Sequence, residues 1–243
     1  MGSVLSSIGI GSATVDTVLD SETLHPGESV DLHVEVEGGS APQEVERIYF
    51  LLETRYLSDE GGYETTTIEQ AVATQSFTIE PDEYREFPAS LTLPRVTPLT
   101  RGNVSVWLKT GLDIDWAKDP QDKDTLEVVP TEKMGAVLDA VERIGFAFSE
   151  SDCKQASVYS DAPFVQEFEF EPTDSRWRRR TDELEVIFAP LADELEMRVE
   201  VDRKESTYTD LTGGDERNEW VTVTHADSRR LRDDLRSRIN ALF

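Results

Sequence analysis

Five aspartates lie close together near the middle of the chain, at a spacing that could bind a metal ion. They are Asp113, Asp115, Asp119, Asp122 and Asp124. Aligned with a helix–loop–helix calcium loop, they place acids at its first, third, seventh and twelfth positions, and hard cations favour clustered oxygens. However, Ala117 occupies the fifth position, and Lys118 stands where the turn needs glycine. We predict a surface turn, with no metal and no other cofactor bound. Weak calcium binding is the alternative.

The most basic stretch of this chain is Arg176-Trp177-Arg178-Arg179-Arg180. It could grip an acidic partner, with Trp177 as the anchor of the interface. The alternative is structural: the arginines pair with acids on neighbouring strands while Trp177 packs inward, and exposed ion pairs of this kind are common and weak. Acidic residues beside the run argue against phosphate or nucleic acid as its ligand.

A second candidate surface is the amphipathic helix predicted for the end of the chain. Its apolar stripe consists of Leu231, Leu235, Ile239 and Leu242, and arginines occupy its other faces. Such a helix can dock into a partner groove or lie on a membrane, but Asp233 and Asp234 weaken the membrane version. We favour packing of the stripe on the fold. The stripe and the basic run together are the candidate interaction surface.

Residues suited to catalysis are sparse. His25, His33 and His225 are far apart in sequence, and no nucleophile elbow, zinc-binding helix or glycine-rich nucleotide loop occurs. In a chain with 50 acidic residues, pairs of carboxylates occur throughout and therefore do not indicate general acid–base catalysis. We predict that the protein is not an enzyme. The alternative is a hydrolytic or ligand-binding sandwich with its site in an interdomain cleft.

The charge of the chain is extreme, with a formal net charge of -26 from 50 acidic and 24 basic residues. Such a surface repels nucleic acid and anionic lipid, so neither is an expected partner. Two interpretations remain: the acids bind cationic partners, or the protein works in molar salt, where the Debye length falls to about 3 Å. The acids are scattered through every segment and lysine is scarce, which favours a halophilic source.

The elements that carry these residues are mostly strands. In the first half, apolar residues alternate with polar ones, which is the period of a half-buried strand, for example at Val30, Leu32, Val34 and Val36. A longer strand is predicted from Glu46 to Tyr56, and Gly61-Gly62 marks a hairpin after it. Several short strands at this spacing predict an antiparallel sandwich.

After Pro130 the period becomes helical. The apolar positions of this predicted helix are Met134, Val137, Leu138, Val141 and Ile144. Thr131 is placed to cap its start and Gly145 to end it. Strands then resume, with Leu195 to Val201 alternating almost without fault. We predict two domains, residues 1–130 and residues 131–243.

Several segments together resemble a known family. They include Gly9 to Val30, Glu44 to Tyr56, the stretch from Trp107 to Asp124, Met134 to Phe146 and Asp182 to Pro190. These resemble the sporulation-control protein family of the stage-zero M type. Arg176 to Arg180 is an insertion that has no match in that pattern. The resemblance implies a mainly β fold of two tandem arrestin-like antiparallel sandwiches, with a short helix opening the second domain and a C-terminal helix closing it.

The resemblance also implies a non-enzymatic regulator or scaffold that binds a protein partner of unknown identity. Homo-oligomerisation through an edge strand is a further expectation, because exposed edges must be paired or protected. No apolar run is long enough for an integral membrane segment. A single cysteine, Cys153, excludes an internal disulfide and is expected in the core. We expect a cytoplasmic protein.

Overall fold

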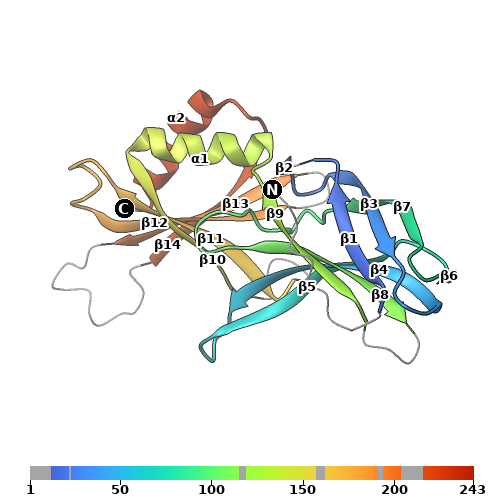
Figure 1. Cartoon of the computed structure of the whole chain (residues 1–243). Coiled ribbons are helices and arrows are strands. Elements are labelled where there is room, and N and C mark those ends of the chain that lie inside the picture. The colour runs from blue at the N-terminus through green and yellow to red at the C-terminus, as the bar shows by residue number, and fades with distance from the viewer. Residues whose placement is uncertain (1–11, 22, 115–118, 157–161, 191–193, 204–215) are drawn as a thin grey trace. The chain divides into compact units, whose positions relative to one another are not determined.

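Alternating apolar and polar residues fold most of this chain into β-strands, which form two units (Figure 1). The computed structural model describes residues 12–21, 23–114, 119–156, 162–190, 194–203 and 216–243. The first unit comprises the chain up to Arg55, Thr65–Thr100 and Ser105–Val129. The second comprises Tyr56–Glu64, Arg101–Val104 and Pro130–Phe243.

The first unit is built from strands. They are β1 (Thr14–Leu19), β2 (Thr23–Leu24), β3 (Ser29–Glu37), β4 (Gln43–Leu57), β5 (Tyr63–Val72), β6 (Phe77–Ile79), β7 (Tyr84–Thr92), β8 (Val106–Ile114) and β9 (Gln121–Val128). One antiparallel sheet has the order β1-β3-β7. A second sheet runs β4-β8-β9-β2, and both β5 and β6 pair with β4. The pairing of β2 with β9 is parallel.

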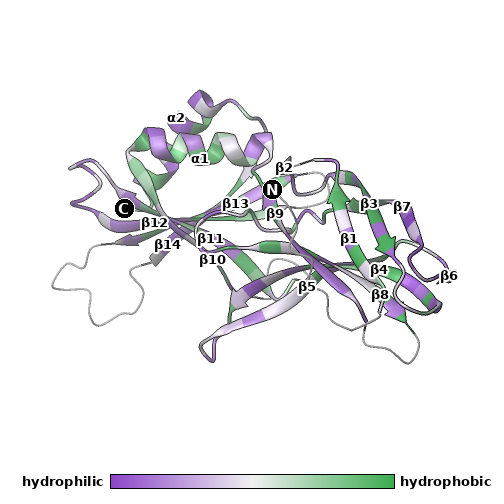
Figure 2. Ribbon diagram, in the orientation of Figure 1, coloured by the Kyte–Doolittle hydropathy of each residue, from purple (hydrophilic) through white to green (hydrophobic). Residues whose placement is uncertain are grey.

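The period-two pattern explains why these strands form. In β3, every second residue is buried, and the four apolar side chains predicted to share one face are all inside. In β4, Ile48, Phe50 and Leu52 are at most 1% exposed. Burying each such side chain contributes about 1.5–3 kcal/mol. Figure 2 shows the same alternation of hydrophobic and hydrophilic residues along the strands.

Two polar contacts link β1 to the other sheet of the first unit. The backbone N–H of Thr17 donates to Asp122 Oδ2 of β9 at 3.1 Å. The Thr17 hydroxyl donates to the Thr110 hydroxyl of β8 at 2.7 Å. Thr17, Thr110 and Asp122 are all buried. These bonds therefore satisfy polar groups that would otherwise be costly to bury.

The second unit combines two helices with a five-stranded antiparallel sheet of order β14-β13-β12-β11-β10. Its elements are α1 (Glu132–Ile144), β10 (Phe146–Gln155), β11 (Phe164–Pro172), β12 (Thr181–Pro190), β13 (Leu195–Arg203), β14 (Glu216–Val223) and α2 (Ser228–Ala241). Both helices lie on the same side of this sheet (Figure 1). No helix of the described residues is long and apolar enough to cross a membrane.

Helix α1 begins and ends where its sequence predicts. The Thr131 hydroxyl accepts the backbone N–H of Met134 at 3.4 Å, which caps the first turn. Gly145 takes the left-handed conformation at φ 113°, which glycine adopts most readily. The apolar stripe of α1, including Val137 and Val141, is buried.

Two short segments from the first half of the chain belong to the second unit. The backbone N–H of Asn103 donates to the Ser151 carbonyl at 2.9 Å. The Tyr63 hydroxyl donates to Asp152 Oδ1 at 2.9 Å. The last residue of β4, Leu57, pairs in parallel with Lys154 of β10. The β4–β5 turn and the 101–104 segment are thus parts of the packing around β10.

The predicted class, mainly β and antiparallel with two helices, is confirmed. Cys153 is 1% exposed, in agreement with its expected place in the core. The predicted acidic turn is shorter than expected. Strand β8 continues to Ile114 and β9 starts at Gln121, so Asp113, Asp122 and Asp124 belong to strands. Burial of Leu112 and Ile114 explains the extension of β8.

Candidate functional site

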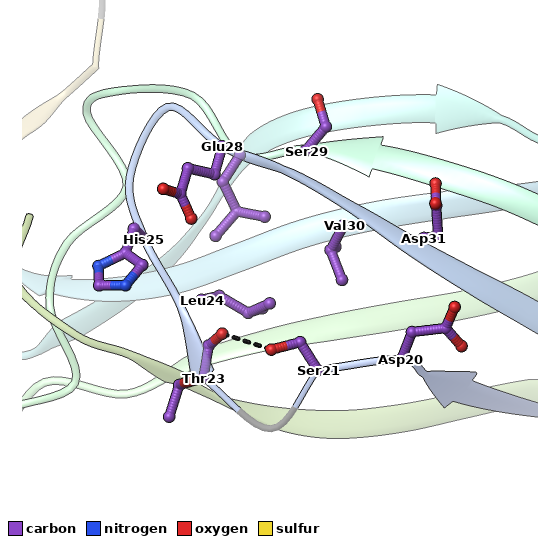
Figure 3. Close-up of a pocket in the computed structure, with 10 residues that line it drawn as sticks. Asp20, Ser21, Thr23, Leu24, His25, Glu28, Ser29, Val30 and Asp31 are labelled. Atoms are coloured by element: carbon purple, nitrogen blue, oxygen red, sulfur yellow. Dashed lines mark hydrogen bonds between the residues drawn. The ribbon is translucent and has the colours of Figure 1, made fainter.

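A cavity of about 220 Å³ lies at β2 and the start of β3 in the first unit (Figure 3). Leu24, Val30 and Leu93 contribute buried apolar side chains to it. Its polar lining consists of Asp20, Ser21, Thr23, His25, Glu28, Ser29 and Asp31. The acidic lining suits a small cationic or hydrogen-bonding group, because it presents carboxylates beside apolar surface.

The two serine hydroxyls of this cavity are already bonded to groups that are not bases. Ser21 Oγ donates to the Thr23 carbonyl at 2.7 Å, and the Ser29 and Thr92 hydroxyls lie 2.8 Å apart. In Figure 3, His25 lies on the opposite side of the cavity from Asp31. A serine nucleophile needs a base within hydrogen-bonding reach and a third group to orient that base. The bonds that the structure describes for Ser21 and Ser29 include no such base.

The aspartates proposed for a calcium loop are directed to different neighbours. Asp113 forms an ion pair with Arg47 at 2.8 Å, and Asp119 Oδ1 accepts the backbone N–H of Ile114 at 3.3 Å. Asp122 binds the amide of Thr17. Asp115 lies outside the described residues. The four described carboxylates therefore do not converge on one point.

Asp124 is the unusual member of this group. Its Oδ2 atom is buried and has no hydrogen-bond partner within the described structure. Burial, followed by its hydrogen bond with Asp122, raises the pKa of Asp124 to about 7. This carboxyl group is therefore partly protonated at neutral pH.

A second acidic cluster surrounds Lys154 in the sheet of the second unit. The ammonium Nζ lies 2.5 Å from Glu167 Oε2 and 3.1 Å from Glu169 Oε1. Burial opposes the charge of Lys154, but the two carboxylates outweigh it and raise the pKa of Lys154. Burial and nearby carboxylates raise the pKa values of Glu183 and Glu185 to about 7 each. The ammonium of Lys154 therefore offsets part of the negative charge of this cluster, and the raised pKa values of Glu183 and Glu185 reduce that charge further.

Spacing alone would let two groups among the described residues hold a metal ion. One is His33, Glu35 and Glu86, and the other is Glu167, Glu169 and Glu185. In each group the three ligand atoms lie within 4.8 Å of one another. In the second group, Lys154 already supplies the positive charge. The first group is on the exposed side of β3 and β7, and nothing further in its geometry indicates a metal.

The basic run forms a turn between β11 and β12. Trp177 is fully buried, and its Nε1 donates to the Ile144 carbonyl at 3.0 Å. Asp174 Oδ1 holds the turn by accepting the backbone N–H groups of Arg176 and Trp177. The ring of Trp177 is therefore inside the fold, as the structural alternative expected, while its role as an interface anchor stays a prediction.

The structural alternative had also expected the arginines of this turn to pair with acids on neighbouring strands. Among the described residues they form other bonds instead. Arg176 and Arg180 donate to Asn240 Oδ1 at 2.8 and 2.9 Å, and Arg178 donates to the Pro172 carbonyl at 3.1 Å. Arg178 and Arg179 are exposed. The basic run thus contacts the end of α2.

The apolar stripe of α2 packs into the second unit. Leu231, Leu235 and Ile239 are 4%, 0% and 0% exposed. Beyond the helix, the ring of Phe243 lies 6.1 Å from that of Trp177. The structure therefore brings together the two halves of the candidate interaction surface. Whether this surface binds a partner stays a prediction.

Sequence reasoning missed Asn240, which joins the two basic segments, and Lys154, which holds the acidic cluster. Asn240 follows the arginine at position 236 by one helical turn, and this spacing was the only available signal. Lys154 stands alone on a strand near many glutamates, so its charge was visible but its partners were not.

Comparison with known proteins finds one family model and close relatives. The model described as "SpoOM protein" matches residues 1–205. The sporulation-control protein spo0M of Bacillus subtilis (strain 168) is 43% identical over 203 residues, which cover 82% of this chain and 79% of the relative. That relative is named for sporulation control.

A solved structure agrees with this match. The crystal structure of Spo0M, the sporulation control protein from Bacillus subtilis, superposes with a TM-score of 0.86 at 36% identity. It covers 96% of this chain and 100% of the solved chain. The resemblance expected from the sequence is therefore confirmed, and the arrestin-like sandwich class is consistent with this fold.

Proposed function

Because the chain belongs to the SpoOM protein family, we propose that it is a non-enzymatic regulator or scaffold that acts by binding other proteins. The observation that carries this proposal is the family match together with the agreement of the folds along nearly the whole chain. The curated relative is a sporulation-control protein, which supports a regulatory role.

The cavity chemistry supports a binding role over a catalytic one. The serine hydroxyls of the 220 Å³ cavity are bonded to a carbonyl and to a threonine. Drug-sized ligands usually occupy cavities of about 300–1,000 Å³ with convergent polar groups. This cavity is smaller than that range. A second cavity, beside β4 and β6, has about 360 Å³, but no described histidine or cysteine lines it. We retain protein binding as the proposal.

An exposed sheet edge is one surface through which the chain could bind another protein. Strand β5 pairs with β4, and no second neighbour for β5 occurs among the described strands. Val72 at its end is 56% exposed. Exposed edges accept further strands by backbone pairing. We include pairing of two copies through such an edge in the proposal, and a cytoplasmic location is part of the same proposal.

Cross-linking of the tagged chain in its own cells at native salt, followed by reconstitution, tests the proposed function. We expect one or a few partner proteins to be cross-linked to the chain at the same positions in each experiment. We also expect the purified chain and partner to form a stoichiometric complex in analytical sedimentation at that salt. Sedimentation of the chain alone reports whether two copies associate.

The opposite outcome is equally defined. A chain that reconstitutes no complex, yet turns over an ester or phosphoester substrate, would contradict the proposal. Loss of that turnover in His25→Ala, with an unchanged melting curve, would assign the activity to the cavity of Figure 3.

A further inference from the structure

We propose that the second unit carries a binding surface for a carboxylate-rich segment of a partner protein. This arginine surface consists of Arg176, Arg178, Arg179, Arg180, Arg229 and Arg236. It rests on the proposed function in one respect, since its ligand belongs to a protein.

The surface is assembled from two segments that are distant in sequence. Asn240 of α2 accepts hydrogen bonds from both Arg176 and Arg180 of the 176–180 turn. The guanidinium of Arg180 also lies 4.2 Å from the centre of the Phe243 ring. Below them, the fully buried Trp177 fixes the turn on the fold. The arginines of the turn therefore have a defined place beside the end of α2.

Helical spacing extends the surface along α2. Arg229, Arg236 and Asn240 are separated by seven and four residues, so they lie along one side of the helix. Because Asn240 faces the 176–180 turn, Arg236 and Arg229 continue from that turn along the same side. Both arginines are exposed.

The arginines of this surface form no ion pair with a carboxylate of the described residues, which is unusual in so acidic a chain. Other arginines of the same helix do have them: Arg230 pairs with Asp227, and Arg232 with Asp233. The chain has 50 acids for 24 bases, yet within the described part of the chain none of these six guanidinium groups forms an ion pair with a carboxylate. Carboxylates from outside would relieve the repulsion among these guanidinium groups.

Arginine is also the right cation for carboxylates. Its planar guanidinium forms two parallel hydrogen bonds with one carboxylate, and such charge-assisted bonds are about twice as strong as neutral ones. All the basic residues of the 176–180 turn and of α2 are arginine, with no lysine among them. Close bidentate pairs keep their strength in high salt better than distant charges do.

Two other anionic partners fit less well. The apolar stripe of α2 is buried in the fold, so the helix has no apolar face to insert into a membrane. A long nucleic acid would leave the patch and meet the body of a chain with net charge -26. The 14 residues of α2 span about 21 Å. An extended segment of about six residues covers that length.

Two of the six arginines, Arg229 and Arg236, lie beyond the residues that the family model describes. That model ends at residue 205, whereas α2 begins at Ser228. The four arginines of the 176–180 turn lie within the matched residues. The inference does not follow from the proposed regulatory role alone.

The test is the binding of a fluorescein-labelled octaglutamate peptide, measured by anisotropy between 0.2 and 2 M KCl where circular dichroism shows a folded chain. Arg179→Gln/Arg236→Gln removes two charges from guanidinium groups that make no bond with any described residue. We expect at least tenfold weaker binding by this variant. The matched control is Arg47→Gln/Arg143→Gln, which removes two arginines that pair elsewhere with Asp113 and Asp139. We expect a change of less than twofold there.

Three results would overturn the inference. They are no peptide binding at any salt at which the chain is folded, equal losses in both variants, and tighter binding of anionic vesicles or of an oligonucleotide with the same dependence on the arginines. Failure of this test leaves the proposed regulator intact, because partner complexes are measured separately by reconstitution. Conversely, if the chain binds the peptide but has no cellular partner, only the proposed regulatory function is contradicted.

Discussion

The free energy of unfolding should fall as pH rises from 6 to 8, because of the glutamates around Lys154. Glu183 and Glu185 have pKa values of about 7 in the folded chain, against 4.5 for the free side chain. Between these values the folded state binds more protons than the unfolded state. The stabilisation is therefore complete below the unfolded pKa and is lost as pH rises through 7.

The size of the effect follows from linkage. A group with a folded pKa of 7 that is fully ionised when unfolded changes stability by about 1.4 kcal/mol between pH 8 and pH 6. Two such groups would give about 3 kcal/mol. Solvent screens half-buried carboxylates, so we expect about half of this, or 1–2 kcal/mol. Ordinary carboxylates titrate near pH 4 and contribute little in this window.

Urea unfolding at fixed KCl, at pH 6, 7 and 8, measures this slope. The variant Glu183→Gln/Glu185→Gln removes both titrations while keeping the side-chain shape. We expect its stability to change less with pH than that of the natural chain. The difference between the two slopes also cancels the contributions of the three histidines and of Asp124. A flat or rising stability in the natural chain, or an unchanged slope in the variant, would refute the reasoning.

Two further predictions concern the helical side of the second unit. Trp177→Phe removes the hydrogen bond to the Ile144 carbonyl, and we expect a loss of about 1–3 kcal/mol in urea unfolding, because a buried carbonyl loses its partner. A loss below 0.5 kcal/mol would show that water replaces the indole. Leu235→Ala should cost about 2–5 kcal/mol, since Leu235 is fully buried in α2. An unchanged melting curve would instead identify α2 as a helix that detaches.

Local patterns were sufficient for most of the secondary structure. The alternation in β3 and the cap residues Thr131 and Gly145 depend only on neighbours in sequence, and both were read correctly. In such segments the buried face and the backbone preference agree. The end of β8 was misplaced because aspartate at position 113 disfavours strands. The Arg47–Asp113 ion pair and the pairing with β4 override that preference.

The candidate site depended on contacts that no local pattern encodes. Arg180 and Asn240 are 60 residues apart, so their hydrogen bond follows from the packing of α2 alone. Lys154 meets Glu167 and Glu169 only because the β10–β11 register places them together. A shift of one residue would move these side chains to the other face of the sheet. The sequence identified the charges but not their partners.

The path of the chain through its two units has a consequence for dissecting the protein. The chain leaves one unit for the other after Arg55, Glu64, Thr100, Val104 and Val129. A fragment that starts at Pro130 would lack the backbone N–H of Asn103 and the hydroxyl of Tyr63. The Ser151 carbonyl and the Asp152 carboxylate of β10 would then lose these hydrogen-bond donors. The second unit therefore cannot be excised at Pro130 without cutting its own hydrogen bonds, and a deletion that keeps them must also retain residues 56–64 and 101–104.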